Sequence, residues 1–183
     1  AHLFSELRGK VRAVLGELKT FAAGAAELDV FYALAEGAVR YEFVKPRVTS
    51  DDVLKIEEGR HPAVERFLAS GTFVPNDLDI GGAQSRVIIL TGPNMSGKSV
   101  YLRQAAVMVV MAQMGAFVPA RSAEIGVVDR IMTRIGARDR MARGESTFMV
   151  EMRETSAIMR LATPRSLILL DEVGRGTSTF DGI

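Results

Sequence analysis

Two short apolar runs and two longer helical patterns organise the chain from residue 86 onward. Residues 86–91 and 166–170 consist mainly of branched apolar side chains, which is typical of strands buried on both faces of a parallel sheet. Residues 100–114 contain no helix breaker and are apolar nearly all round, so they predict a buried helix with Gly115 at its C-terminal end. A further helix is predicted over 148–162, before Pro164.

The first 45 residues show a different pattern, a single apolar stripe. Its members recur at alternating spacings of four and three, the seam of a long helix packed on a partner helix: Leu7, Val11, Val14, Leu18, Phe21, Ala25, Leu28 and Tyr32. A plain helical hairpin core fits the stripe equally well. Gly9, Gly16 and Gly24 lie off the seam and favour a bend or break. Residues 45–52 then read as a linker, which divides the chain into a helical segment, 1–45, and a second domain, 46–183.

A phosphate-binding loop pattern follows the first apolar run. Gly92-Pro93-Asn94-Met95-Ser96-Gly97-Lys98-Ser99 has two glycines spaced by four residues and then lysine and serine. Such a loop points backbone N–H groups at phosphate oxygens, and the lysine adds a charge toward the β- and γ-phosphates. The Ser99 hydroxyl is a candidate ligand for Mg²⁺. A glycine-rich turn that binds nothing is the weaker interpretation, given the strand and helix predicted on either side.

The second apolar run ends in two carboxylates, Asp171 and Glu172. At the C-terminal end of a strand beside the phosphate loop, Asp171 is placed to hold a hydrated Mg²⁺. Glu172 is then placed to act as general base toward an attacking water. The alternative is that the two acids only cap the next loop, and the phosphate loop makes that alternative weaker. The pair therefore predicts nucleotide hydrolysis.

Composition narrows the function classes further. The 183 residues are 48% hydrophobic and 25% charged, as in an ordinary globular protein. The sequence has no cysteine and only two histidines, which argues against disulfides, thiol catalysis and a metal cluster beyond Mg²⁺ bound with phosphate. A net charge of +1 gives no general attraction to nucleic acid. No leader or membrane-spanning segment is predicted, so we expect a cytosolic setting without a membrane role.

The region between the linker and the phosphate loop is a candidate for the nucleotide base pocket. Phe73 offers an aromatic face and Asn76 a polar edge, shortly before the first apolar run. Taken alone, the pattern favours a simpler interpretation in which Phe73 and His61 are packing and turn residues.

Three segments together resemble the ATPase domain of the MutS family of DNA mismatch-repair proteins. They are the loop Thr91 to Ser99, the segment Gly144 to Met152, and the run Leu169 to Gly182, which reads Leu-Leu-Asp-Glu-Val-Gly-Arg-Gly-Thr-Ser-Thr-Phe-Asp-Gly. The resemblance covers residues 59–183 strongly, and residues 1–45 more loosely resemble the end of the family's core and lever helices. A nuclease-bearing branch of the family usually has threonine-glycine at the positions of Met95 and Ser96. The chain therefore resembles the mismatch-repair branch more closely at these two positions.

The resemblance implies a fold and roles for particular residues. It implies an α/β, ABC-type ATPase sheet with flanking helices, which binds ATP or ADP with Mg²⁺ and pairs with a second copy. Ser146 would complete the partner's site in trans, Asn94 would contact the γ-phosphate, Phe73 would stack on adenine, and Asp181 would lie near the dimer interface. The N-terminus of the helix predicted after Ser146 gives the trans role a physical basis.

The resemblance also implies what lies outside these residues. No part of the chain resembles the family's mismatch-reading, connector or clamp domains, so contact with mismatched double-stranded DNA would come from domains absent here. The chain stops shortly after Asp181, and we expect a C-terminally truncated ATPase domain whose sheet lacks a central strand. Such a fragment is expected to be inactive alone, because unpaired strand groups inside a core cost about 1 to 3 kcal/mol each.

The leading functional hypothesis is therefore a homodimeric ATPase that couples ATP state to DNA binding in mismatch repair. The resemblance further implies a downstream MutL-type repair protein as partner and a bacterial, nucleoid-associated cytosolic setting. One alternative is a nucleotide-gated DNA-binding scaffold in which hydrolysis is incidental, and the intact Asp171-Glu172 pair argues against it. A transporter ATPase subunit has less support, since Gly144-Glu145-Ser146-Thr147 differs from the leucine-serine-glycine-glycine signature of that class.

Overall fold

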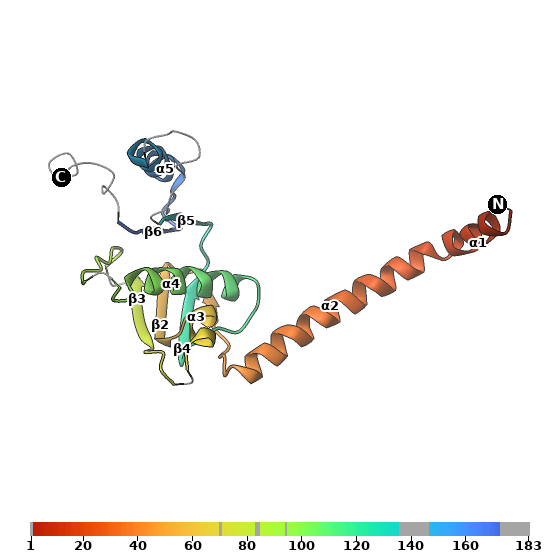
Figure 1. The fold of residues 1–183 in the computed structure, drawn as a ribbon, viewed down its shortest axis with the longest axis horizontal. Helices are drawn as coiled ribbons and strands as arrows, with labels where there is room; N and C mark the ends of the chain where they lie inside the picture. The colour runs from red at the N-terminus through yellow and green to blue at the C-terminus, as the bar shows by residue number, and fades with distance from the viewer. Residues whose placement is uncertain (1, 70, 83–84, 94, 136–146, 173–183) are drawn as a thin grey trace. The chain divides into compact units, whose positions relative to one another are not determined.

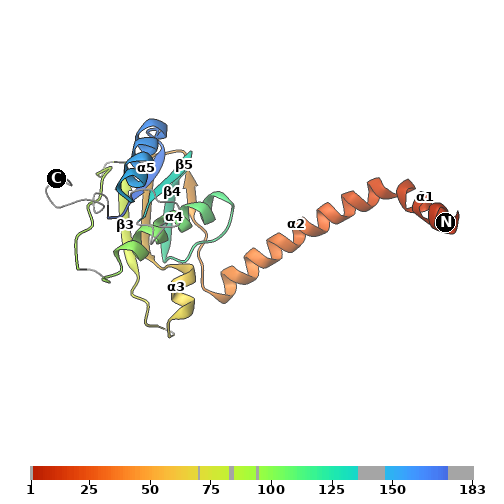
Figure 2. The same cartoon turned by 45° about the horizontal axis from the view of Figure 1, so that its top comes forward.

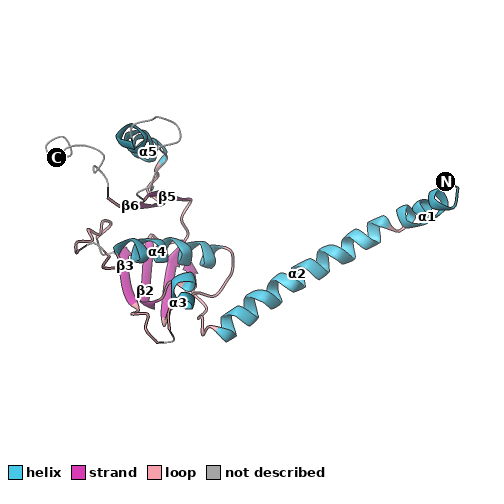
Figure 3. Cartoon of the chain, viewed as in Figure 1, coloured by secondary structure: helices cyan, strands magenta, loops and turns pink. Residues whose placement is uncertain are grey.

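The computed structural model describes residues 2–69, 71–82, 85–93, 95–135 and 147–172. These residues belong to two compact units, Ala1–Glu42 and Phe43–Ile183. Helices and strands are distinguished by colour in Figure 3. Within the described ranges, no helix combines the length and the apolar character needed to cross a membrane.

The first unit consists of helices α1 (His2–Ala13) and α2 (Leu15–Arg40). The stripe predicted as one long helix is interrupted at Val14, two residues before Gly16, where the backbone leaves helical geometry at φ −105° and ψ 9°. The stripe residues Leu7, Leu18 and Phe21 are 60%, 49% and 78% exposed. Among the described residues of these two helices only Ala38 is buried, so this unit contains no hairpin core of its own.

The second unit contains a four-stranded mixed sheet in the order β1-β4-β2-β3. The strands are β1 (Arg47–Thr49), β2 (Val53–Gly59), β3 (Asn76–Gly81) and β4 (Ser122–Gly126), and only the β1–β4 pair is parallel. The short helix α3 (Pro62–Phe67) connects β2 to β3. Because β1 pairs with β4, the segment predicted as a linker takes part in the sheet instead.

Helix α4 (Lys98–Gln113) packs on one face of this sheet, as Figures 1 and 2 both show. Strand β2 alternates, with Leu54 and Ile56 buried and Lys55 exposed, as expected of a sheet covered on one side. Ile56 and Ile125 meet Met108 of α4 in the core. Burying these apolar side chains is the main stabilising contribution of this layer.

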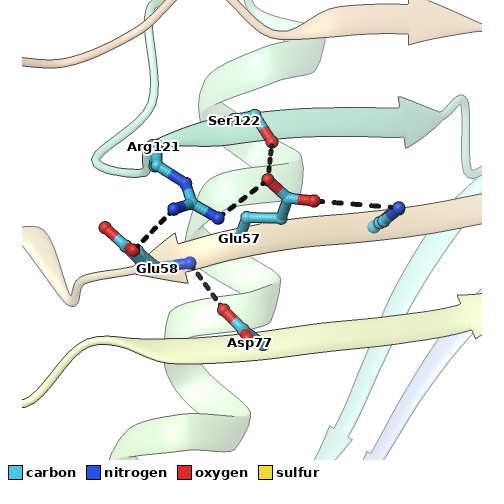
Figure 4. A network of polar contacts seen from close by, with 6 residues as sticks. Glu57, Glu58, Asp77, Arg121 and Ser122 are labelled. Atoms are coloured by element: carbon cyan, nitrogen blue, oxygen red, sulfur yellow. Dashed lines mark hydrogen bonds and ion pairs between the residues drawn. The ribbon is translucent and has the colours of Figure 1, made fainter.

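The opposite face of the sheet carries a network of charges (Figure 4). The Glu57 carboxylate accepts hydrogen bonds from Ser122 Oγ at 2.9 Å and from Arg121 Nη2 at 3.3 Å. Arg121 Nη1 also lies 2.9 Å from the Glu58 carboxylate. The Ser122 hydrogen bond, followed by that of Arg121, lowers the pKa of Glu57 below its ordinary value. These contacts are exposed to solvent, so we expect them to fix the sheet surface and contribute little to stability.

A second, two-stranded parallel sheet is formed by β5 (Arg130–Arg134) and β6 (Ser166–Leu170). Helix α5 (Thr147–Leu161) connects the two strands in sequence. The predicted strand over 166–170 and the predicted helix before Pro164 are thus confirmed. The mixed α/β class is confirmed as well, while the described strands do not form the single sheet of a phosphate-loop NTPase.

The predicted strand over residues 86–91 is not formed, so this prediction is wrong. Val87 and Ile89 are 69% and 82% exposed, and the segment pairs with none of the described strands. A cavity of about 400 Å³ is lined by Val87, Ile88 and Leu90 and by residues 166–170 of β6. An apolar run becomes a strand only when a neighbour accepts its backbone hydrogen bonds, and no described strand does so here.

Helix α4 also differs from its prediction. Its buried residues lie on one side, and Val110 remains 52% exposed, so the helix is not buried all round. The predicted end is confirmed, because Gly115 directly follows the C-cap residue Met114 with a left-handed φ of 87°.

Candidate phosphate and metal site

The loop before α4 has the backbone conformation that its glycines allow. Gly92 has φ 148° and Gly97, the N-cap of α4, has φ 91°. A Cβ placed on Gly92 would lie 3.4 Å from Ser96 Oγ. Met95 has φ 66°, and its side chain is exposed. At positions 92 and 97 this left-handed backbone favours glycine, and the first N–H groups of α4 have no carbonyl partner within the helix.

The side chain of Lys98, the first residue of α4, reaches back across this loop. Its ammonium donates hydrogen bonds to the carbonyl oxygens of Gly92 at 2.6 Å and of Pro93 at 2.7 Å. An ammonium has three donors, and these two bonds fix its position across the loop. The charge of Lys98 is therefore held at the loop and is not extended into solvent.

Ser99 and Asp171 are in contact although they are 72 residues apart. The Ser99 hydroxyl donates a hydrogen bond to Asp171 Oδ2, and Asp171 is only 9% exposed. The backbone N–H of Asp171 donates to the carbonyl of Arg134 at 2.7 Å, which continues the β5–β6 ladder by one bond. The structure thus places a hydroxyl oxygen and a carboxylate oxygen side by side, and both are ligand types that Mg²⁺ prefers.

A cavity of about 520 Å³ adjoins this contact and is lined by Thr91, Gly92, Lys98, Asp171 and Glu172, among others. In the described ranges there is no cluster of three or more His, Cys, Asp or Glu able to hold a metal alone. Ser99 and Asp171 therefore fit a Mg²⁺ that takes its remaining ligands from water and phosphate, which is how this ion is usually bound. Glu172 has a left-handed φ of 55°, an uncommon conformation for a residue with a side chain.

The predicted base-pocket residues do not line this cavity. Phe73 is partly exposed in the turn before β3. Asn76 is the first residue of β3, and its side-chain amide donates to the carbonyl of Val74 at 2.9 Å. Two other predicted site residues, Asn94 and Ser146, lie outside the described residues, as does Asp181.

His61 is a helix cap in this structure. Its Nδ1 accepts hydrogen bonds from the backbone N–H groups of Ala63 and Val64, at 3.3 and 3.4 Å. Burial lowers the pKa of His61 below its ordinary value of 6.5. These contacts agree with the simpler interpretation of His61 as a turn residue. An Nδ1 that accepts hydrogen bonds must be unprotonated, so protonation of this nitrogen would break the cap.

Two residues near the site, Tyr101 and Arg134, make contacts that the sequence pattern does not predict. The Tyr101 hydroxyl donates to the backbone carbonyl of Asp77 at 2.9 Å and so joins α4 to β3. Burial, with the charge of Asp77 adding to it, raises the pKa of Tyr101. Arg134 is 9% exposed at the end of β5. The sequence around Arg134, Arg-Ile-Met-Thr-Arg, does not distinguish it from the exposed Arg130 of the same strand, and nothing near Tyr101 marks its hydrogen bond to β3.

These features define an α/β protein with a candidate site for phosphate and a divalent cation. The loop before α4 supplies glycines and a lysine, and the end of β6 supplies a carboxylate.

Comparison with known proteins assigns the chain to a family. The family model described as MutS domain V matches residues 88–183. The chain is 54% identical over 181 residues to the DNA mismatch repair protein MutS of Syntrophobacter fumaroxidans, covering 99% of the chain and 20% of that protein. The MutS proteins of Sorangium cellulosum and Thermodesulfovibrio yellowstonii are 56% and 58% identical, over 99% and 85% of the chain and 20% and 19% of their own lengths. The chain belongs to the MutS family, and it spans about a fifth of the length of these relatives.

Proposed function

We propose that this chain binds ATP with Mg²⁺ and, within a longer polypeptide, hydrolyses it as a phosphate-loop NTPase of the ABC type. The contact between Ser99 and Asp171 supports this proposal most directly, because it joins the phosphate-loop sequence to the carboxylate end of β6. The adjoining cavity, lined by Gly92, Lys98 and Glu172, supports it further. Bound Mg²⁺ would neutralise charge that develops on the phosphate oxygens.

Four residues of the loop, Gly92, Gly97, Lys98 and Ser99, have defined tasks in this proposal. Lys98 would exchange its bonds to the carbonyl oxygens of Gly92 and Pro93 for bonds to phosphate oxygens, which carry more negative charge. The left-handed Gly92 and Gly97 allow the backbone to approach the phosphates closely. Ser99 and Asp171 would hold the cation, and the free N–H groups at the start of α4 would face the anion.

Glu172 is the proposed general base. It directly follows Asp171 and lines the same cavity as Lys98. A carboxylate there would orient a water molecule and accept its proton at a carboxylate oxygen. The left-handed backbone of Glu172 costs about 1 to 3 kcal/mol in general, and such strain is concentrated at functional sites.

The role of the longer protein is proposed from the family. The relatives are named DNA mismatch repair protein MutS, and the chain covers about a fifth of each. We infer that ATP state at this site is coupled to binding of mismatched double-stranded DNA by domains outside these residues. A homodimer, completed in trans by Ser146, and a MutL-type downstream partner belong to the same proposal, as does a bacterial cytosolic setting. Such coupling requires two states that differ in nucleotide affinity.

The test is ATP turnover by the full-length polypeptide with Glu172→Ala, compared with Glu154→Ala as a matched control. Glu154 lies on α5 and is half exposed, so its replacement should leave turnover close to that of the parent. We expect Glu172→Ala to retain ATP binding and to lose roughly 10²- to 10⁴-fold in turnover, the usual contribution of a general base.

The outcomes separate the parts of the proposal. Unchanged turnover with bound ATP would show that Glu172 is not the base, and failure of the parent to bind ATP with Mg²⁺ would refute the site itself. Release of mismatched DNA is then compared between ATP and a non-hydrolysable analogue. Equal release with both would favour a nucleotide-gated scaffold in which hydrolysis is incidental.

A further inference from the structure

Arg134 occupies the end of β5, where the two-stranded sheet meets the candidate site. It is the last residue of the strand and pairs with Leu170 of β6. Its carbonyl accepts the hydrogen bond from the backbone N–H of Asp171 at 2.7 Å. The main chain of Arg134 therefore helps to set the position of the carboxylate that contacts Ser99.

The side chain of Arg134 extends to helix α5. Its Nη2 lies 3.8 Å from a carboxylate oxygen of Glu151, and its Nε lies 3.3 Å from a carboxylate oxygen of Glu154. Its Nη1 donates to the carbonyl of the next residue, Ile135, at 3.1 Å. A single residue thus contacts Asp171 through its backbone and the second turn of α5 through its guanidinium.

The two ion pairs differ in their surroundings. The Glu151 side chain is 4% exposed, whereas that of Glu154 is 48% exposed. The Glu154 carboxylate is open to solvent, which weakens its pair with the buried Arg134 Nε even though the distance is shorter. The Glu151 pair is shielded from water, and removal of one partner would leave a buried charge, which is strongly unfavourable. Glu151 is consequently the contact that resists separation of α5 from the end of β5.

We propose that Arg134 is a positioning residue that links the cation and phosphate site to helix α5. A shift of Asp171 when its carboxylate binds a cation would move the end of β5 through their backbone hydrogen bond. The buried pair with Glu151 would carry this shift to α5, since a buried ion pair has few alternative arrangements of equal energy. The inference rests on the proposed function, because it requires that the Ser99–Asp171 site binds a cation with nucleotide.

The experiment is hydrogen–deuterium exchange of the full-length polypeptide, read on peptides that cover residues 147–161. The probe is a non-hydrolysable ATP analogue, added with Mg²⁺ or with a chelator. We expect the analogue with Mg²⁺ to slow exchange in the first two turns of α5 by about 5- to 10-fold, the range of a modest coupling between sites. With the chelator the exchange of α5 should not change, because Asp171 meets the nucleotide only through the cation.

Glu151→Gln is the main variant, since it keeps the shape of the side chain and removes its charge. We expect this variant to bind the analogue as the parent does and to lose the protection of α5. Arg134→Lys is the second variant, which keeps the positive charge without the planar guanidinium, and it should lose the protection too. Glu154→Gln is the control and should keep it. If either main variant does not fold, the other decides.

Failure of this inference can be told apart from failure of the proposed function. Protection of α5 that survives in Glu151→Gln or Arg134→Lys would refute the role of Arg134. The role would also be refuted if the parent binds the analogue without any change in the exchange rate of α5. A purely structural role predicts faster exchange of α5 with and without nucleotide, with the same protection factor in the variants and the parent. Absence of analogue binding by the parent would refute the proposed function itself.

Discussion

Gly81 and Gly82 are adjacent glycines that share a left-handed backbone but differ in their surroundings. Their φ angles are 88° and 57°. A Cβ on Gly81 would lie 1.9 Å from the carbonyl oxygen of Asp52, whereas a Cβ on Gly82 would meet nothing within 4 Å. Both glycines lie at the end of β3. Replacing each of them with alanine therefore separates the cost of the backbone conformation from the cost of a steric clash.

The magnitudes follow from these distances. A left-handed alanine costs about 1 to 2 kcal/mol, of which roughly 0.4 to 1 kcal/mol is recovered through the less flexible unfolded chain. Gly82→Ala should thus destabilise the sheet by about 1 kcal/mol. In Gly81→Ala the new carbon must also move from 1.9 to at least 3.4 Å from a backbone oxygen, a displacement of 1.5 Å. The strands paired at Val53 and Gly81 would have to separate, which adds about 2 to 3 kcal/mol by analogy with overpacked cores.

The assay is hydrogen–deuterium exchange on peptides that cover β2 and β3 in the full-length polypeptide, because global unfolding of a long protein is rarely two-state. The difference between the two variants corresponds to roughly 30- to 150-fold faster exchange in Gly81→Ala. Equal acceleration in both variants would refute the reasoning, since it would mean that Gly81 does not approach the carbonyl of Asp52 closely.

Two further predictions concern stability. Ile125→Ala should cost about 2 to 5 kcal/mol of stability, because Ile125 is fully buried between the sheet and α4. Val127→Ala is the control and should cost far less, because Val127 is 43% exposed. Limited proteolysis of both variants checks this difference in stability. His61 has a lowered pKa, so the unfolded chain binds the proton more readily. Its contribution to stability is complete above pH 6.5 and is lost as the pH falls through the lowered folded value. His61→Asn, which can cap α3 without titrating, should abolish that pH dependence of α3 exchange, and a retained dependence would contradict the assignment.

Features that depend on residues close together in the chain could be predicted from the sequence. The strand Ser166–Leu170, the helix ending before Pro164 and the left-handed Gly115 after α4 follow from local apolar runs and breakers. The phosphate-loop pattern and the carboxylates after β6 were likewise readable from spacing alone. The roles assigned to these residues in nucleotide chemistry stay predictions.

Which segments pair depends on the tertiary structure. Residues 86–91 have the composition of a buried strand but pair with none of the described strands, whereas Arg47–Thr49, which resembled a linker, forms β1 against β4. The buried pair of Arg134 and Glu151 and the cap formed by His61 could not be read from the sequence either. The physical reason is that apolar patterns record which side chains avoid water, while backbone pairing and buried charge depend on partners supplied by distant parts of the chain.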